Sequence, residues 1–195
     1  AWRSLTEKDE RLAAKVIAAD ESIDRQEVDI EDECLKIVAL HQPAAIDLRR
    51  TATILKVNND LERIADLAVN MAERGQRLRA AGELAIPGTL REMAQLARRM
   101  VNDALNALVR LDPKAAVRVC AADDEVDRSH AEVVGQLYRV MRNNVHDIAA
   151  AIHFLSVARQ VERIADHATN IAEDVIYLVR GDIARHLTGS HGSEP

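Results

Sequence analysis

A near-duplicated segment constrains this chain more than any other feature. ERIADLAVNMAE at 62–73 and ERIADHATNIAE at 162–173 agree at nine of twelve positions, and the second copy follows the first by 100 residues. A second pair, ADESIDR at 19–25 and ADDEVDR at 122–128, is offset by 103 residues. Self-similarity at a nearly fixed spacing is the signature of a repeated structural unit. The chain therefore carries a unit of about 100 residues twice.

Both copies of this segment have the hydrophobic spacing of long helices. Their apolar residues follow alternating steps of four and three, which places them in a seam along one helix face. Aromatic residues make up only 2% of the chain, which is typical of packed helices rather than of sheets. The seam consists of Val157, Val161, Ile164, Ala168, Ile171, Val175 and Leu178 in the second copy, and of Val57, Leu61, Ile64, Ala68 and Met71 in the first.

Proline, glycine and asparagine residues divide the chain into five predicted helices, because these residues end helices or begin turns. The breaks fall at Gln42-Pro43, between Gly82 and Gly88, at Asp112-Pro113 and at Asn143-Asn144. We expect helices at about 6–41, 43–80, 88–110, 112–142 and 145–180, with a flexible tail at 183–195.

The two repeats differ in their number of helices. The second, 83–182, has three helices, whereas the first, 1–82, has two, because the equivalent of 88–110 would precede residue 1. The predicted fold class is all-α, with two tandem antiparallel three-helix bundles, of which the first lacks its opening helix. Since its core then lacks one wall, we predict apolar surface on the first repeat that is exposed or covered by another chain.

Charge and hydropathy argue against two classes of protein. A formal net charge of -6 does not fit a nucleic-acid binder, which normally presents a basic patch. No apolar run approaches the ~20 residues that a bilayer-spanning helix needs. Cys34 and Cys120 lie within apolar helical patterns, so we expect buried thiols in a reducing compartment.

Pairs of acidic residues four positions apart recur at matching places in the repeats. One such pair is weak evidence, since 32 acidic residues in 195 produce about five by chance. Each pair lies on one face of its helix. Counted from the helix turns, the pair on one helix is level with the pair on the next, antiparallel helix. The candidate residues are Asp20, Asp24, Glu62 and Asp66 in the first repeat, and Asp123, Asp127, Glu162 and Asp166 in the second.

The acids of the first repeat also occupy a helix face that is normally apolar. Asp20, Asp24, Glu27 and Glu31 continue a four-three spacing, with isoleucine and valine on both sides. Partly buried carboxylates that face one another repel and need cations or protons. We therefore predict metal ions on these carboxylates. Oxygen ligands favour magnesium, manganese, calcium or iron over zinc, although the identity stays open.

A second interpretation neutralises the same acids with arginine. Arg63 and Arg163, together with Arg25, Arg128 and Arg159, could form salt-bridge ladders without any metal. Asn70 and Asn170 recur one turn beyond the aspartates, either as further oxygen ligands or as hydrogen-bonding groups between helices.

Enzyme signatures are missing from the sequence. His130, His153 and His167 are scattered, and no Glu-x-x-His pair of the di-iron type occurs. Phosphate loops, nucleophile elbows and Cys-x-x-Cys pairs are also missing. We therefore predict that the chain is not an enzyme.

Taken together, the repeated ERIAD…N…AE motif, QPAAIDLR at 42–49 and the acidic pairs resemble the PhoU family, over about residues 5–180. The family motif usually has glycine at the positions of Ala65 and Ala165, and the second repeat has NNVHDIAA at 143–150 in place of the QPxAxDLR turn. The resemblance implies two three-helix bundles related by approximate twofold symmetry, with metal clusters at the acidic motifs.

The resemblance also implies a function. It predicts a cytoplasmic negative regulator of phosphate uptake and phosphate signalling. Its partners would be a PhoR-like sensor histidine kinase and the PstB-like ATPase of a phosphate ABC transporter, with a homodimer expected and membrane association through partners only. The alternative from another class is a structural or metal-storage helical protein without a signalling partner.

Overall fold

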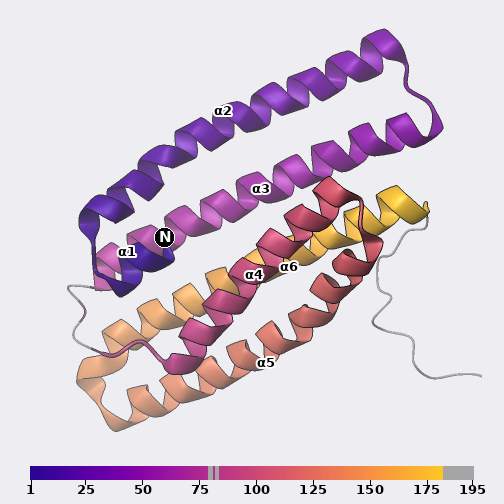
Figure 1. Cartoon of the computed structure of the whole chain (residues 1–195). Helices are drawn as coiled ribbons and strands as arrows, with labels where there is room; N and C mark the ends of the chain where they lie inside the picture. Colours follow the sequence, from indigo (N-terminus) through magenta and orange to yellow (C-terminus); the bar gives the residue numbers. More distant parts are fainter. Residues whose placement is uncertain (79–80, 82–83, 182–195) are drawn as a thin grey trace, which may run out of the picture.

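The computed structural model describes residues 1–78, 81 and 84–181, and within them the chain is entirely helical apart from turns. The predicted all-α fold is therefore confirmed for the described part of the chain. The tail predicted at 183–195 lies outside the described residues. The helices are α1 (Trp2–Thr6), α2 (Glu10–His41), α3 (Ala45–Leu78), α4 (Gly88–Arg110), α5 (Pro113–Asn143), the 3-10 turn η1 (Val145–Asp147) and α6 (Ile148–Arg180) (Figure 1).

The observed helix bounds follow the predicted ones closely except at the start of the chain. Instead of one helix from residue 6, a short helix ends at Thr6 and α2 begins at Glu10. Lys8 adopts a left-handed conformation with φ 51°, which interrupts the helix. Asp9 then caps α2, because its side chain accepts a hydrogen bond of 3.0 Å from the backbone N–H of Leu12. The prediction was wrong here, because a cap inside a polar stretch gives no break in hydrophobic spacing.

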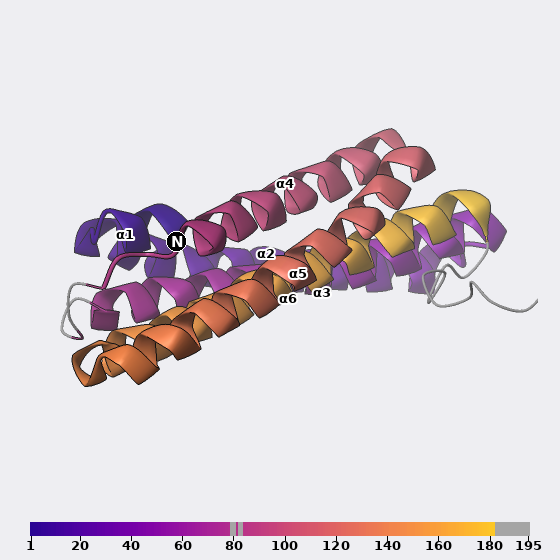
Figure 2. The same ribbon diagram turned by 90° about the horizontal axis from the view of Figure 1, so that it is seen from below.

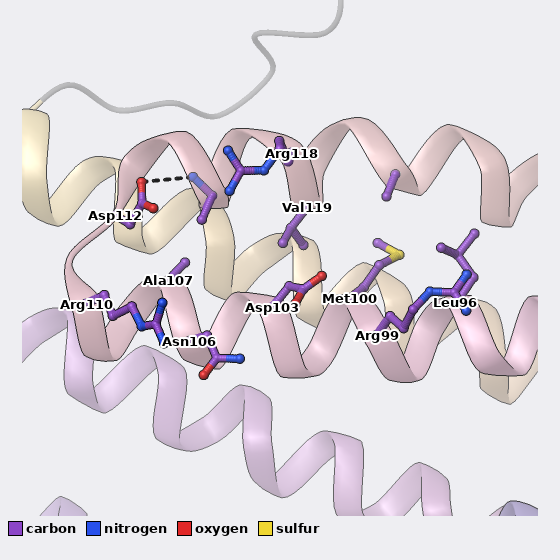
Figure 3. A pocket seen from close by; sticks show the side chains of 12 residues that line it. Leu96, Arg99, Met100, Asp103, Asn106, Ala107, Arg110, Asp112, Arg118 and Val119 are labelled. Atoms are coloured by element: carbon purple, nitrogen blue, oxygen red, sulfur yellow. Dashed lines mark hydrogen bonds between the residues drawn. The ribbon is translucent and has the colours of Figure 1, made fainter.

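The turn between α4 and α5 shows why the proline signal was reliable. The Asp112 side chain accepts hydrogen bonds from the N–H groups of Lys114 at 2.9 Å and Ala115 at 3.0 Å. Figure 3 shows one of these bonds. Pro113 occupies the first helical position, where the missing N–H costs nothing. Asp112 and Pro113 together therefore begin α5 within one residue of the predicted start at 112.

The long helices run antiparallel to their chain neighbours (Figures 1 and 2). Helices α4, α5 and α6 pack against one another as a three-helix bundle, while α2 packs on α3. Contacts between α3 and α6 join the two parts. Helix α6 lies at the centre of the molecule, because it contacts α3, α4 and α5.

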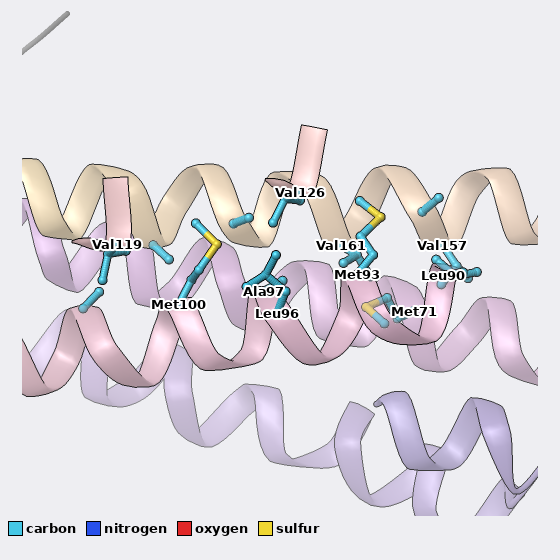
Figure 4. Packing of buried hydrophobic residues seen from close by; sticks show 14 of the residues in the cluster. Met71, Leu90, Met93, Leu96, Ala97, Met100, Val119, Val126, Val157 and Val161 are labelled. Carbon is cyan, nitrogen blue, oxygen red and sulfur yellow. The ribbon is translucent and has the colours of Figure 1, made fainter. Parts of the chain in front are cut away.

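The hydrophobic core follows the predicted seam, which is buried more completely in the second repeat. In α6, Ile164 is partly buried and the other six seam residues are buried. In α3, Val57 and Met71 are buried, but Leu61, Ile64 and Ala68 are only partly so. Core side chains from α3, α4, α5 and α6 that meet in this region include Met71, Leu90, Met93, Met100, Val126 and Val161 (Figure 4).

Apolar side chains on the first repeat are exposed, as the sequence predicts. The short α1 contacts α3, and its Leu5 is buried against Gly75, where an added Cβ would lie 3.2 Å from the Leu5 Cα. Farther along the first repeat, large apolar residues reach solvent: Ile23, Val28, Ile30, Leu35, Ile37, Val38 and Leu40 on α2, and Ile46, Leu48 and Ile54 on α3. None of the described helices combines the length and the apolar character that crossing a bilayer requires.

Candidate functional site

The first group of predicted acids lies between α2 and α3. We define the first cluster as Asp20, Asp24 and Glu27 of α2 with Glu62 and Asp66 of α3. Slight burial, followed by the charges of Asp24 and Asp66, raises the pKa of Asp20. Burial also raises the pKa of Glu62, and the charges of Asp66, Asp24 and Glu27 add to this effect. Since these influences cross from one helix to the other, the two predicted pairs are neighbours in space.

The second group lies between α5 and α6. We define the second cluster as Asp123, Asp127 and His130 of α5 with Glu162 and Asp166 of α6. Burial raises the pKa of Asp123 to about 6, and the charges of Asp166 and Asp127 contribute in the same direction. Desolvation also raises the pKa of Asp166, which lies at the exposed edge of the cluster, with further contributions from Glu162 and Asp127. The structure therefore brings these predicted pairs together as well.

A buried oxygen in the second cluster lacks a hydrogen-bond partner among the described residues. The Asp123 Oδ1 atom is shielded from solvent without a donor, and so is the neighbouring Thr169 Oγ1. Thr169 lies close enough to lower the pKa of Asp123, although the two groups do not meet the geometry of a hydrogen bond. An unpaired buried carboxylate oxygen costs free energy unless a proton or cation reaches it. This observation makes the second cluster a fit for a cation.

The clusters are nevertheless not closed metal sites as the side chains stand. Within the part of the chain that the structure describes, no three His, Cys, Asp or Glu side chains are grouped closely enough to hold one metal ion. Asp24, Asp127 and Asp166 are exposed, so both clusters open to solvent at one edge. The donor atoms are mainly carboxylate oxygens, which suit hard cations with flexible coordination. Metal binding here would require the carboxylates to turn toward a shared ion.

His130 is a member of the second cluster that the sequence reasoning missed. Its Nδ1 lies 3.2 Å from Glu162 Oε1. His130 follows Glu27 by 103 residues, the same offset that relates ADESIDR to ADDEVDR. This shared offset is the sequence signal that could have identified His130 as the counterpart of Glu27. The first cluster thus has a carboxylate where the second has an imidazole, so their donor sets differ.

Arginine neutralises part of the first cluster. Arg63 lies 3.4 Å from both a Glu62 and an Asp66 oxygen. Its charge lowers the pKa of Glu62, yet burial and the surrounding acids together still raise it. Arg25 instead pairs with Glu21, outside the cluster, at 3.8 Å. Arg163 lowers the pKa of Asp166 without reversing the net rise. Arginine is therefore present at both clusters but does not cancel the repulsion.

The repeated asparagines form hydrogen bonds between or within helices. The Asn70 amide donates to the Asp66 backbone oxygen at 2.9 Å. The Asn170 amide approaches Asp60 Oδ1 at 3.4 Å, and His167 Nδ1 lies 2.7 Å from the same oxygen. Asp60 is buried and connects α3 to α6. Of the two roles left open for the asparagines, the structure favours hydrogen bonding, and it adds Asp60 as a structural residue that was not predicted.

Comparisons with known proteins place the chain in a family. The PhoU domain model matches residues 1–75 and 90–175. The chain is 40% identical over 185 residues to the phosphate-specific transport system accessory protein PhoU homolog of Pseudomonas putida, covering 94% of this chain and 72% of that protein. It is 38% identical over 188 residues to the homolog of the same name from Pseudomonas aeruginosa, covering 96% and 78%.

Solved structures give the same result. The crystal structure of PhoU from Pseudomonas aeruginosa superimposes with a TM-score of 0.88 at 38% identity, covering 92% of this chain and 87% of that one. The phosphate transport system regulatory protein PhoU from Streptococcus pneumoniae superimposes with a TM-score of 0.84 at 25% identity, covering 93% and 85%. With the duplicated motif, the helical fold and the level acidic pairs, these matches show that the chain belongs to the PhoU family.

Proposed function

We propose that this protein is a negative regulator of phosphate uptake and phosphate signalling that acts as a metal-carrying helical adaptor. The coarser part follows from the family: its relatives are named accessory or regulatory proteins of phosphate transport, and this chain has a regulatory role in that system. The relatives are not named as enzymes, in agreement with the sequence prediction. The finer parts, metal and partners, are the proposal.

The observation that supports the metal is the unpaired Asp123 oxygen inside a group of like charges. Asp20, Asp24, Glu62 and Asp66 would hold an ion between α2 and α3. Asp123, Asp127, Glu162 and Asp166 would hold another between α5 and α6, with His130 beside them. A bound divalent or trivalent cation supplies positive charge and polarising power rather than any reaction here. The residues themselves orient their oxygens and hold two helices at a fixed distance.

Regulation would occur by contact. We propose that helix surfaces engage the sensor domain of a PhoR-like histidine kinase and the PstB-like ATPase of a phosphate ABC transporter, in the cytoplasm and as a homodimer. The exposed edges of both clusters make them accessible to a partner, because Asp24, Asp127 and Asp166 face solvent. A cation at these edges would either set the shape of the contact surface or bridge to an acidic partner.

A pull-down experiment tests the adaptor role. The purified chain, with and without prior chelation by EDTA, is incubated separately with the kinase sensor domain and the transporter ATPase. We expect capture of both partners and at least about a tenfold loss of affinity after chelation, which corresponds to ~1.4 kcal/mol. Re-addition of manganese should restore capture. Capture that is unchanged by chelation would leave an adaptor without a metal role, and bound metal without any partner would indicate storage.

A further inference from the structure

A basic pocket lies between α4 and α5, at the end of the bundle where these two helices meet. Its cavity has a volume of about 310 Å³. Its floor is formed by buried apolar side chains that include Met100 and Val119, and Arg99, Arg110 and Arg118 line it (Figure 3). An apolar floor with guanidinium groups around it suits an oxyanion, because arginine offers a planar fork of donors to phosphate oxygens.

The charge balance of the pocket favours an anion. Among the described residues, none of the three arginines forms an ion pair, and all three are exposed. Two acids, Asp103 and Asp112, also line the pocket. Asp112 accepts two backbone hydrogen bonds at the start of α5. The charge of Arg118 nevertheless helps to lower the pKa of Asp112, so both carboxylates count against the three guanidinium groups and the lining keeps one net positive charge.

Three apolar residues that adjoin the pocket arginines in the sequence, none of them part of the pocket lining, are exposed to solvent. Val109, next to Arg110, is 83% exposed, the highest value among the exposed large apolar residues. Leu111 is 43% exposed and adopts a left-handed conformation with φ 51°, which is unfavourable for a bulky residue. Val117, next to Arg118, is 44% exposed. A soluble anion would gain nothing from these side chains, whereas a lipid surface would bury them.

The same end of the molecule carries a second apolar turn. Figures 1 and 2 both place the α2–α3 turn and the α4–α5 turn at the end where α6 finishes. Beside the α2–α3 turn, Leu40 is 76% and Ile46 52% exposed. Of the two arginines that follow, Arg50 is paired with Asp47 at 3.5 Å and Arg49 lies over the Tyr177 ring. Both turns therefore present exposed aliphatic side chains with arginine nearby.

We propose that this end of the protein binds directly to an anionic membrane surface, with a lipid phosphate in the Arg99–Arg110–Arg118 pocket and Val109 and Leu111 entering the headgroup region. Peripheral binding of this kind combines apolar insertion with attraction of basic residues to anionic lipid. It goes further than the predicted membrane association through partners only. It requires no metal and no protein partner.

The test is co-flotation of the full chain with vesicles of phosphatidylcholine, with and without phosphatidylglycerol. We expect binding to the anionic vesicles, little binding to the neutral ones, and weakening by added salt. The R110Q/R118Q variant should bind about thirtyfold more weakly, because each arginine near the surface contributes ~1 kcal/mol. The V109S/L111N variant should also bind more weakly, and asparagine is compatible with the left-handed position of Leu111.

Matched controls keep the result specific. R91Q/R142Q removes the same charge from the opposite ends of α4 and α5, and V145S removes a 76% exposed valine from the α5–α6 turn. Both controls should bind within about threefold of the parent chain, and circular dichroism should show unchanged helix content in all variants. Three results would overturn the proposal: no flotation with anionic vesicles, equal losses in the test and control arginine pairs, or displacement by inorganic phosphate but not by sulfate at equal ionic strength.

Discussion

Asp123 is the residue whose environment departs furthest from that of a solvated acid. It faces Asp166 and Asp127, and its Oδ1 has no hydrogen-bond donor among the described residues. Its counterpart Asp20 is less enclosed, although its pKa is raised by the same kinds of cause. The two repeats therefore place equivalent aspartates under unequal repulsion. A bound cation or proton therefore stabilises the site of Asp123 more than the site of Asp20.

The pH dependence of stability follows from this difference. The pKa of Asp123 rises from 3.8 to about 6 in the folded protein, so the folded state binds the proton more tightly than the unfolded state. Its stabilising contribution is full below about pH 4 and is lost as pH rises through 6. After allowance for partial exposure, we expect metal-free Asp123→Asn to be about 1 kcal/mol more stable than the parent chain at pH 7 and equal to it near pH 4.

Urea unfolding in EDTA at several pH values measures this effect. Asp20→Asn is the matched control in the first repeat, and its gain should have the same sign and a smaller size. A metal-free Asp123→Asn chain that is less stable than the parent at pH 7 would show that the ionised carboxylate is stabilised by contacts other than those described.

At the scale of helices, a polar contact joins α3 to α6 in the middle of an apolar interface. Asp60 is 7% exposed, and its Oδ1 atom forms hydrogen bonds with the side chains of His167 and Asn170 on α6. A second link, between Lys56 Nζ and Asp174 Oδ1 at 2.7 Å, lies one turn away on α3. Since α3 belongs to the first repeat and α6 to the second, these contacts fix how the two repeats meet.

Removal of the Asp60 carboxylate should therefore weaken the contact between repeats. Asp60→Ala leaves the His167 and Asn170 groups without their shared acceptor, and we expect a loss of about 1–3 kcal/mol in the free energy of unfolding by urea. Asp60→Asn keeps an acceptor oxygen and should lose less. Equal losses for the two variants would mean that packing, rather than hydrogen bonding, accounts for the effect.

The helices were predictable from the sequence to different degrees. Hydrophobic spacing and the Asp112-Pro113 signal predicted α4, α5 and α6 closely, because these helices bury their seams. The break at Lys8 was missed, since a left-handed residue other than glycine has no hydrophobic signature. His130 was missed because single histidines are common, and only the 103-residue offset links it to Glu27.

At the scale of the whole molecule, the two repeats share motifs but not surroundings. The pairing of acids across α2–α3 and α5–α6 was predictable, because antiparallel helices with equal counts from a turn place side chains level. The degree of burial of each acid was not predictable, because it depends on how the neighbouring helices pack. Helices α4, α5 and α6 each pack against the other two, whereas α2 packs mainly against α3 and α1. This asymmetry explains why Asp123 is more strongly perturbed than Asp20.

The central claim is that level acidic pairs on adjacent helices share cations at two places. Anomalous X-ray diffraction from crystals of the full chain grown with manganese tests it most directly. We predict anomalous peaks between α2 and α3, bounded by Asp20, Asp24, Glu62 and Asp66, and between α5 and α6, bounded by Asp123, Asp127, Glu162 and Asp166, with the second peak the stronger. Manganese-loaded crystals with no peak at either position, and carboxylates paired with Arg63 and Arg163 instead, would contradict the claim.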